Sequence, residues 1–142
     1  MTTKEYLSQV SRINKMINNK LSEVYQIKTL ACSITVAVGE ERVQSSGNQD
    51  RLGNTVAKFV DLEKEVDVMI DELIEKRKTL INQIDSLENE IYYELLTLKY
   101  IKGDKLDKIA DDMGYSFRQI TRIHGAALLD FEKKYGKTYL EK

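Results

Sequence analysis

The residues best suited to binding chemistry stand together near the C-terminus, in the run Ser-Phe-Arg-Gln-Ile-Thr-Arg at 116–122. An arginine side chain can donate two parallel hydrogen bonds to O6 and N7 of a guanine in the major groove of DNA. Arg118 and Arg122 are four residues apart, so on a helix they share one face. The run therefore predicts a surface that reads base edges in double-stranded DNA. The predicted DNA-binding residues are Ser116, Phe117, Arg118, Gln119, Thr121 and Arg122.

Three short helices are predicted around this run, in the order of a helix-turn-helix. Residues 91–101 form an apolar helical pattern before Gly103, and residues 106–113 form a second one before Gly114. Glycine readily adopts a positive φ, so we expect Gly114 in the tight turn. Ser116 is a favoured N-cap and opens the third helix. The expected small core contains Ile109, Ala110, Met113, Ile120 and Ile123.

The run LTLKYIKGDKLDKIADDMGYSFRQITRIHGAALLDF resembles region four of bacterial sigma factors. The positions that match the pattern of that family are Leu106, Ile109, Ala110, Gly114, Ser116, Ile120, Ile123, Ala127 and Leu128. The resemblance covers about 45 residues. It implies recognition of a −35 promoter element and contact with RNA polymerase. It also implies that Phe117, Arg118, Gln119 and Arg122 face DNA, with Phe117 either on a thymine methyl group or packed back onto Tyr115.

The first 90 residues depart from a complete sigma factor, because they carry coiled-coil patterns and none of the aromatic-rich sequence that melts promoter DNA. A long helical N-terminus with a terminal region-four-like domain is similar to phage and prophage late-gene regulators of the ArpU and RinA type. That resemblance implies a transcription regulator rather than a sigma factor.

Two long helices are predicted upstream. Residues 3–30 place apolar side chains, including Tyr6 and Leu21, at three- and four-residue steps, and residues 54–90 carry apolar residues at heptad spacing. Glu63 and Arg77 interrupt the heptads, and paired polar residues of this kind often set register. A glycine- and serine-containing loop is expected near 39–53, and the apolar segment 31–38 before it either extends the first helix or packs as an irregular segment. The helices pair within one chain as an antiparallel hairpin, or partly with a second chain.

The predicted fold class is therefore all-α, with a helical hairpin or coiled coil at 1–90 and a helix-turn-helix domain at 91–142. The absence of proline from all 142 residues agrees with this. The net charge is −1, but residues 51–90 hold 6 basic and 10 acidic side chains, whereas residues 91–142 hold 10 and 8. Non-specific DNA affinity should be modest, because phosphate neutralisation supplies most of that term.

No enzyme signature is found. One histidine and one cysteine are too few for the usual zinc sites or nucleophilic triads, so no catalytic residue, metal or cofactor is expected. His124 is expected at the surface or on a phosphate, and Cys32 in the core. No segment has the length of a membrane span, and no secretory signal is present, so we expect a cytoplasmic protein.

The leading functional hypothesis is a sequence-specific transcription regulator of phage or prophage type. Its expected partners are double-stranded DNA, RNA polymerase and further copies of itself through the coiled coil, with no membrane partner. Two alternatives are a DNA-packaging oligomer like a small terminase subunit and a coiled-coil scaffold that binds only protein. Ring assembly would favour the terminase-like alternative.

Overall fold

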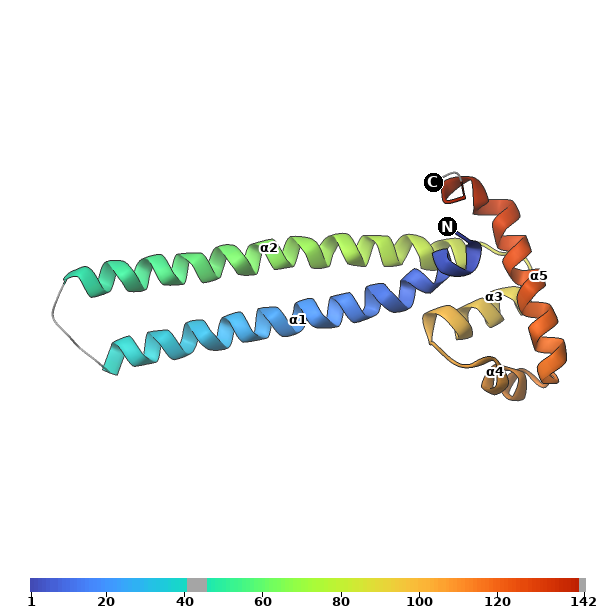
Figure 1. The fold of residues 1–142 in the computed structure, drawn as a ribbon, viewed down its shortest axis with the longest axis horizontal. Helices are drawn as coiled ribbons and strands as arrows, with labels where there is room; N and C mark the ends of the chain where they lie inside the picture. Colours follow the sequence, from blue (N-terminus) through green and yellow to red (C-terminus); the bar gives the residue numbers. More distant parts are fainter. Residues whose placement is uncertain (41–45, 141–142) are drawn as a thin grey trace. The chain divides into compact units, whose positions relative to one another are not determined.

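The computed structural model describes the backbone of residues 1–40 and 46–140, and the side chains of residues 1–33 and 53–140. Within these ranges it is helical, with no β-strand, which confirms the all-α class. The order of elements is α1 (Thr3–Glu40), α2 (Ser46–Asp85), α3 (Glu90–Leu96), a π-helical turn (Thr97–Ile101), α4 (Leu106–Met113), α5 (Phe117–Tyr135) and a 3-10 turn (Gly136–Thr138) (Figure 1).

Two compact units are formed by contacts along the chain. The first contains residues 1–14 and 75–142, and the second contains residues 15–74. Each unit therefore takes part of α1 and part of α2. The predicted domain boundary at 90–91 coincides with the start of α3, inside the first unit.

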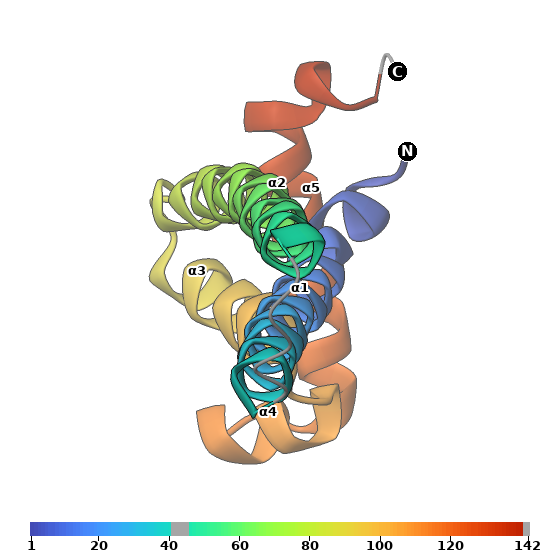
Figure 2. The same ribbon diagram turned by 90° about the vertical axis from the view of Figure 1, so that its left-hand side faces the viewer.

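In the second unit, the segments of α1 and α2 lie side by side and run antiparallel (Figures 1 and 2). Val66 and Ile70 of α2 are buried, as the heptad pattern predicts. The heptad interruption Glu63 forms an ion pair with Lys28 of α1, at 3.4 Å between Oε1 and Nζ. This polar position thus lies within reach of the other helix and pairs residue 63 with residue 28.

The long helices differ from prediction in their ends. The first helix continues past residue 30 to Glu40, so residues 31–38 extend it, which is one of the two alternatives left open by the sequence. The second helix begins at Ser46 rather than 54 and ends at Asp85 rather than 90. The predicted loop at 39–53 is shorter, because residues 46–53 are helical; residues 41–45 lie outside the described part of the chain. Two predicted burials are wrong: Leu21 is 52% exposed, and Cys32 is exposed.

The first unit has a well-buried core in which both long helices meet the short ones. Its fully buried side chains include Leu7 of α1, Ile84 of α2 and Phe131 of α5. Tyr6 stacks on Tyr139, with ring centroids 4.2 Å apart, and the hydroxyl groups of Thr3 and Tyr139 share a buried hydrogen bond of 2.7 Å. The start of α1 is therefore part of the core that supports α3, α4 and α5.

Polar contacts also join the long helices inside this unit. The Arg77 Nε donates to Asn14 Oδ1 at 2.7 Å, and the Tyr6 hydroxyl donates to Gln83 Oε1 at 2.8 Å. Arg77, the second interruption of the heptads, thus has a hydrogen-bond partner on α1. This removes the cost of leaving a partly buried guanidinium without a partner.

Candidate nucleic-acid interface

Helices α4 and α5 are joined by a three-residue turn at 114–116. Gly114 has φ +76° and ψ 28°, the left-handed conformation that ends many helices, and its N–H bonds back to the carbonyls of Ala110 and Asp111. The Tyr115 N–H donates to the Ala110 carbonyl at 2.9 Å. The predicted role of Gly114 is confirmed, because residues with a β-carbon rarely adopt this conformation.

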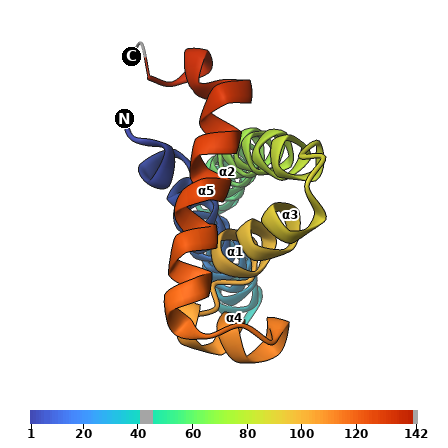
Figure 3. The same ribbon diagram turned by 90° about the vertical axis from the view of Figure 1, so that its right-hand side faces the viewer.

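The helices that surround this turn pack through small and branched residues. Ile109, Ala110 and Ile120 are at most 2% exposed, which confirms the predicted small core. Figure 3 shows α5 running past α3, with α4 near the N-terminal end of α5, and both helices contact α5. The start of α5 is therefore held on a rigid support.

Ser116 and Gln119 form a reciprocal capping box at the start of α5. The Ser116 Oγ accepts from the Gln119 N–H at 3.2 Å, and the Gln119 Oε1 accepts from the Ser116 N–H at 3.0 Å. The Thr121 hydroxyl donates to the Phe117 carbonyl at 2.8 Å. Of the six predicted DNA-binding residues, these three polar side chains already have one partner each in the protein; the Gln119 amide NH2, the Ser116 O–H and the Thr121 lone pairs are left for a base.

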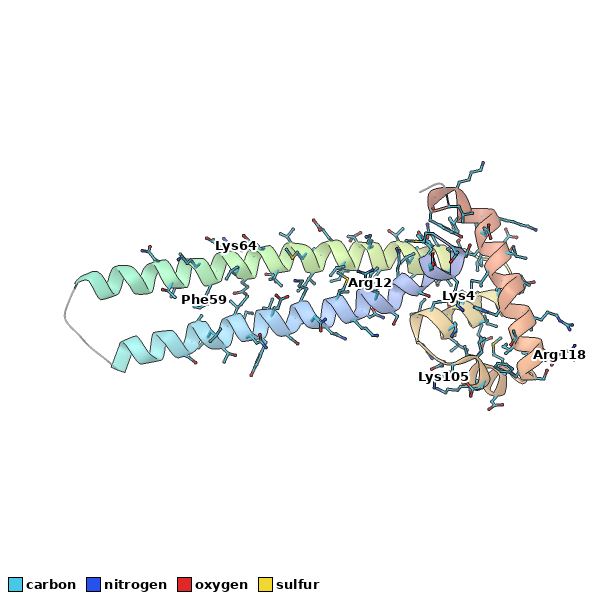
Figure 4. The ribbon with its side chains drawn as sticks, in the orientation of Figure 1. Lys4, Arg12, Phe59, Lys64, Lys105 and Arg118 are labelled. Carbon is cyan, nitrogen blue, oxygen red and sulfur yellow. The ribbon has the colours of Figure 1, made fainter. Side chains whose placement is uncertain are left out.

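The two arginines of the predicted site are free. Arg118 and Arg122 are exposed, and neither forms an ion pair or a hydrogen bond with the described residues. The first turn of α5 contains no acidic side chain. Figure 4 shows Arg118 extending away from α5. With the partial positive charge of the helix N-terminus, the two guanidinium groups make this end of α5 attractive to anions.

Phe117 is 58% exposed at the same end of α5, whereas Tyr115 packs against the core of the first unit. No ring contact joins Phe117 to Tyr115 among the aromatic pairs of the described residues. Of the two predicted roles, packing onto Tyr115 is therefore not observed. An exposed phenyl ring remains available to an apolar group such as a thymine methyl.

Other charges around α4 are mixed. Asp111 and Asp112 are exposed, and so are Lys102 and Lys105; the position of Lys105 is labelled in Figure 4. Lys108 forms an ion pair with Asp104 at 3.5 Å. Residues 102–112 hold three basic and four acidic side chains, so the region around α4 offers no net positive charge.

His124 is placed differently from the surface position expected for it. It is 8% exposed, and its Nε2 shares a hydrogen bond of 2.8 Å with the Tyr100 hydroxyl. Burial lowers the pKa of His124 below its usual 6.5, and the nearby charges of Lys99 and Lys4 lower it further. Burial also raises the pKa of Tyr100 to about 12. The pair is thus a neutral internal contact that joins α5 to the π-helical turn.

The sequence contained a signal for the capping box that the spacing argument missed. A serine followed three residues later by glutamine is a known N-terminal pattern of helices. It assigns Ser116 and Gln119 a structural role first. His124 lies four residues after Ile120 and three before Ala127, so helical spacing would have placed it on the buried face of α5. Its hydrogen-bond partner Tyr100 had no local signal, because it lies 24 residues away.

The described residues contain no group of three or more His, Cys, Asp or Glu side chains arranged to hold a metal ion. Among the described helices, none combines the length and the apolar character required to cross a membrane. The free groups at the start of α5 are hydrogen-bond donors, a phenyl ring and cationic charge, which suit binding rather than bond-making chemistry.

The chain matches the family described as "Protein of unknown function (DUF1492)" over residues 35–132, which is more than half of its length. The matched segment contains α2, α3, α4 and most of α5. Comparisons with curated proteins and with solved structures give no match.

Proposed function

The chain belongs to the DUF1492 family, and we propose that it is a sequence-specific DNA-binding protein that regulates transcription. The start of α5 enters the major groove of double-stranded DNA, and the protein acts by binding rather than as an enzyme. In line with the resemblance to sigma region four and to phage regulators, RNA polymerase is its second partner. This role places it in the cytoplasm.

The observation that carries the proposal is the pair of free arginines on a capped, supported helix start. Arg118 and Arg122 are exposed and have no ion-pair partner among the described residues. Two like charges four residues apart on a helix, without a carboxylate partner, do not stabilise that helix. They do suit a guanine edge or a phosphate, each of which can accept two hydrogen bonds from one guanidinium.

The small net charge of the C-terminal region limits non-specific attraction to DNA. With 10 basic and 8 acidic side chains in residues 91–142, few phosphates can be neutralised, so little affinity is available from non-specific attraction. The arginines at the start of α5 should therefore carry a large share of binding.

The test begins with selection of bound sequences from a random duplex library by the full-length protein. Fluorescence anisotropy on the selected duplex then compares Arg118→Ala and Arg122→Ala with wild type. Each substitution should weaken binding about tenfold or more, since loss of a bidentate base contact costs about 1–3 kcal/mol, and 1.4 kcal/mol is a factor of ten. Arg12→Ala is the matched control, because Arg12 is an exposed arginine on α1.

Arg118→Lys distinguishes the two kinds of contact. A lysine keeps the charge but cannot pair bidentately, so base reading predicts a loss of sequence preference with a nearly unchanged salt dependence. If both alanine variants kept their circular dichroism spectra and bound the selected duplex as tightly as wild type and Arg12→Ala, the proposed function would be refuted.

A further inference from the structure

The second unit, residues 15–74, exposes far more apolar surface than a two-helix hairpin can cover. Among its described side chains only Val66 and Ile70 are buried. Nine large apolar side chains are between 38% and 73% exposed: Met16, Leu21, Tyr25, Leu30, Val60, Leu62, Val68, Met69 and Ile74. Single exposed apolar residues are ordinary, but a concentration of this size marks an interaction surface.

The spacing of these residues shows which surface they form. The α2 positions that face α1 recur by heptads; Phe59, for example, lies on the α1 side of α2, with Lys64 on the opposite side (Figure 4). Val60 and Ile74 are two heptads apart on one flank of this seam, and Leu62 and Met69 are one heptad apart on the other. In a bundle of more than two helices such flanking positions join the core.

The same arrangement continues on α1. Met16 and Leu30 are two heptads apart, and the ion pair between Lys28 and Glu63 brings Leu30 to the level of Leu62. Exposed apolar side chains therefore lie at matching levels of both helices. Only a further pair of helices laid along the hairpin would cover them.

The charges of α1 and α2 indicate which helices would cover these apolar side chains. Residues 15–33 of α1 hold three basic and one acidic side chain, whereas residues 53–74 of α2 hold two basic and six acidic ones. Among the described residues of this unit, the ion pairs are Lys20 with Glu23 and Lys28 with Glu63. Most acidic groups of α2 are thus left without an ion-pair partner, and a second α1 segment carries the complementary charge.

We propose that residues 15–33 and 53–74 form the interface of a dimer, in which a second copy of this chain lays its α1 against α2 of the first. Twofold symmetry then repeats the contact and makes a four-helix bundle. A standard interface takes about 20–30 residues from each partner, which a hairpin of this length supplies. The inference stands on the apolar flanks and the charges of the hairpin and does not depend on DNA binding.

The experiment measures self-association of the full-length protein. Sedimentation equilibrium gives the mass, which for the dimer is twice the chain mass of 16.4 kDa. A concentration series in the same experiment gives the dissociation constant. We expect a dimer at micromolar concentration.

Two double variants separate the flanks, Val60→Gln with Ile74→Gln, and Leu62→Gln with Met69→Gln. Glutamine keeps helix propensity and removes the apolar surface. At least one double variant should weaken association 100-fold or more with an unchanged helical spectrum. Leu129→Gln is the matched control, because Leu129 is a 60% exposed leucine on α5, in the first unit.

A charge reversal tests which helix lies against α2. Asp67→Lys should weaken the dimer, because a basic α1 segment would then face an added lysine. A tighter dimer would mean that an acidic α2 faces it and would overturn the arrangement. The proposed interface would be refuted if the wild-type protein stayed monomeric at about 100 micromolar. It would also be refuted if both double variants dimerised as tightly as wild type.

Discussion

Gly125 lies in the middle of α5, where glycine is a costly choice. It is seven residues after Arg118 and three after Arg122, so it shares their exposed face. A β-carbon added at Gly125 would meet no atom within 4 Å apart from its chain neighbours and the backbone of its own helix, and its backbone is helical without a positive φ. Nothing inside the described protein therefore requires glycine there.

Gly125→Ala should raise the free energy of unfolding by about 0.5–1 kcal/mol, the usual difference between the two residues inside a helix. Urea unfolding followed by far-ultraviolet circular dichroism measures this as a higher midpoint at unchanged slope. On the proposed DNA-facing side, the added methyl group would stand where a groove wall approaches α5. We therefore expect the affinity for the selected duplex to fall while stability rises.

Gly114→Ala is the matched comparison. A β-carbon there also meets nothing within 4 Å, but φ is +76°, so alanine should destabilise the protein by about 1–2 kcal/mol. The same chemical change thus has opposite signs at two positions that differ in backbone conformation. If Gly125→Ala destabilised the protein as much as Gly114→Ala, the argument that Gly125 is not needed for folding would be refuted.

Three further outcomes concern the first unit. Leu80 is 2% exposed, so Leu80→Asp should lower stability by about 3–5 kcal/mol in a thermal melt, while Leu80→Met should cost less than about 1.5 kcal/mol. Tyr6→Phe removes the hydrogen bond to Gln83 but keeps the ring stack on Tyr139, and should cost about 1 kcal/mol in urea unfolding; no measurable cost would mean that this bond is not formed in solution. Because the folded-state pKa of His124 is depressed, its neutral form is favoured; stability should be full above pH 6.5 and fall as the pH drops below 6.5 towards the folded-state pKa. His124→Gln should flatten this part of the pH profile, and an equal slope in both proteins would argue against the burial of His124.

Local signals were sufficient for the short helices of the C-terminal region. The turn at Gly114 and the cap at Ser116 each act on a few neighbouring residues, so their residue types predict their geometry. The heptad spacing of α2 likewise predicted burial of Val66 and Ile70, because a repeat of this kind leaves only one face for packing.

Contacts between residues far apart in the sequence could not be predicted from local patterns. The spacing of residues 3–30 indicates an amphipathic helix, but it cannot show that Tyr6 and Leu7 pack into a core with Phe131. The end of α2 at Asp85 was also missed, because the following turn contains neither glycine nor proline. The signal present there is Asn89, whose side chain accepts from the N–H groups of Ile91 and Tyr92 and starts α3.

In the candidate site, residue type correctly predicted which side chains are exposed, but not which of them already have hydrogen-bond partners within the protein. All six predicted residues are exposed, yet Ser116, Gln119 and Thr121 have hydrogen-bond partners within α5 or at its cap. Hydroxyl and amide side chains at a helix start serve the backbone first, since the first N–H groups of a helix lack partners in the helix. Arginine cannot serve those donors, which is why Arg118 and Arg122 stay free.

The contact between Thr3 and Tyr139 has a consequence for the order in which the chain folds. The two residues are separated by 136 positions, and Leu7 lies in the same core as Phe131. Ribosomal synthesis delivers the N-terminal residues first, so Tyr6 and Leu7 must wait, uncovered, until α5 has emerged. Closing such distant contacts is slow compared with forming a single helix, and exposed apolar groups favour aggregation meanwhile. A fragment that begins at residue 91 lacks Leu7, Ile84 and Leu87 of this core, so it should form helices without a fully closed core.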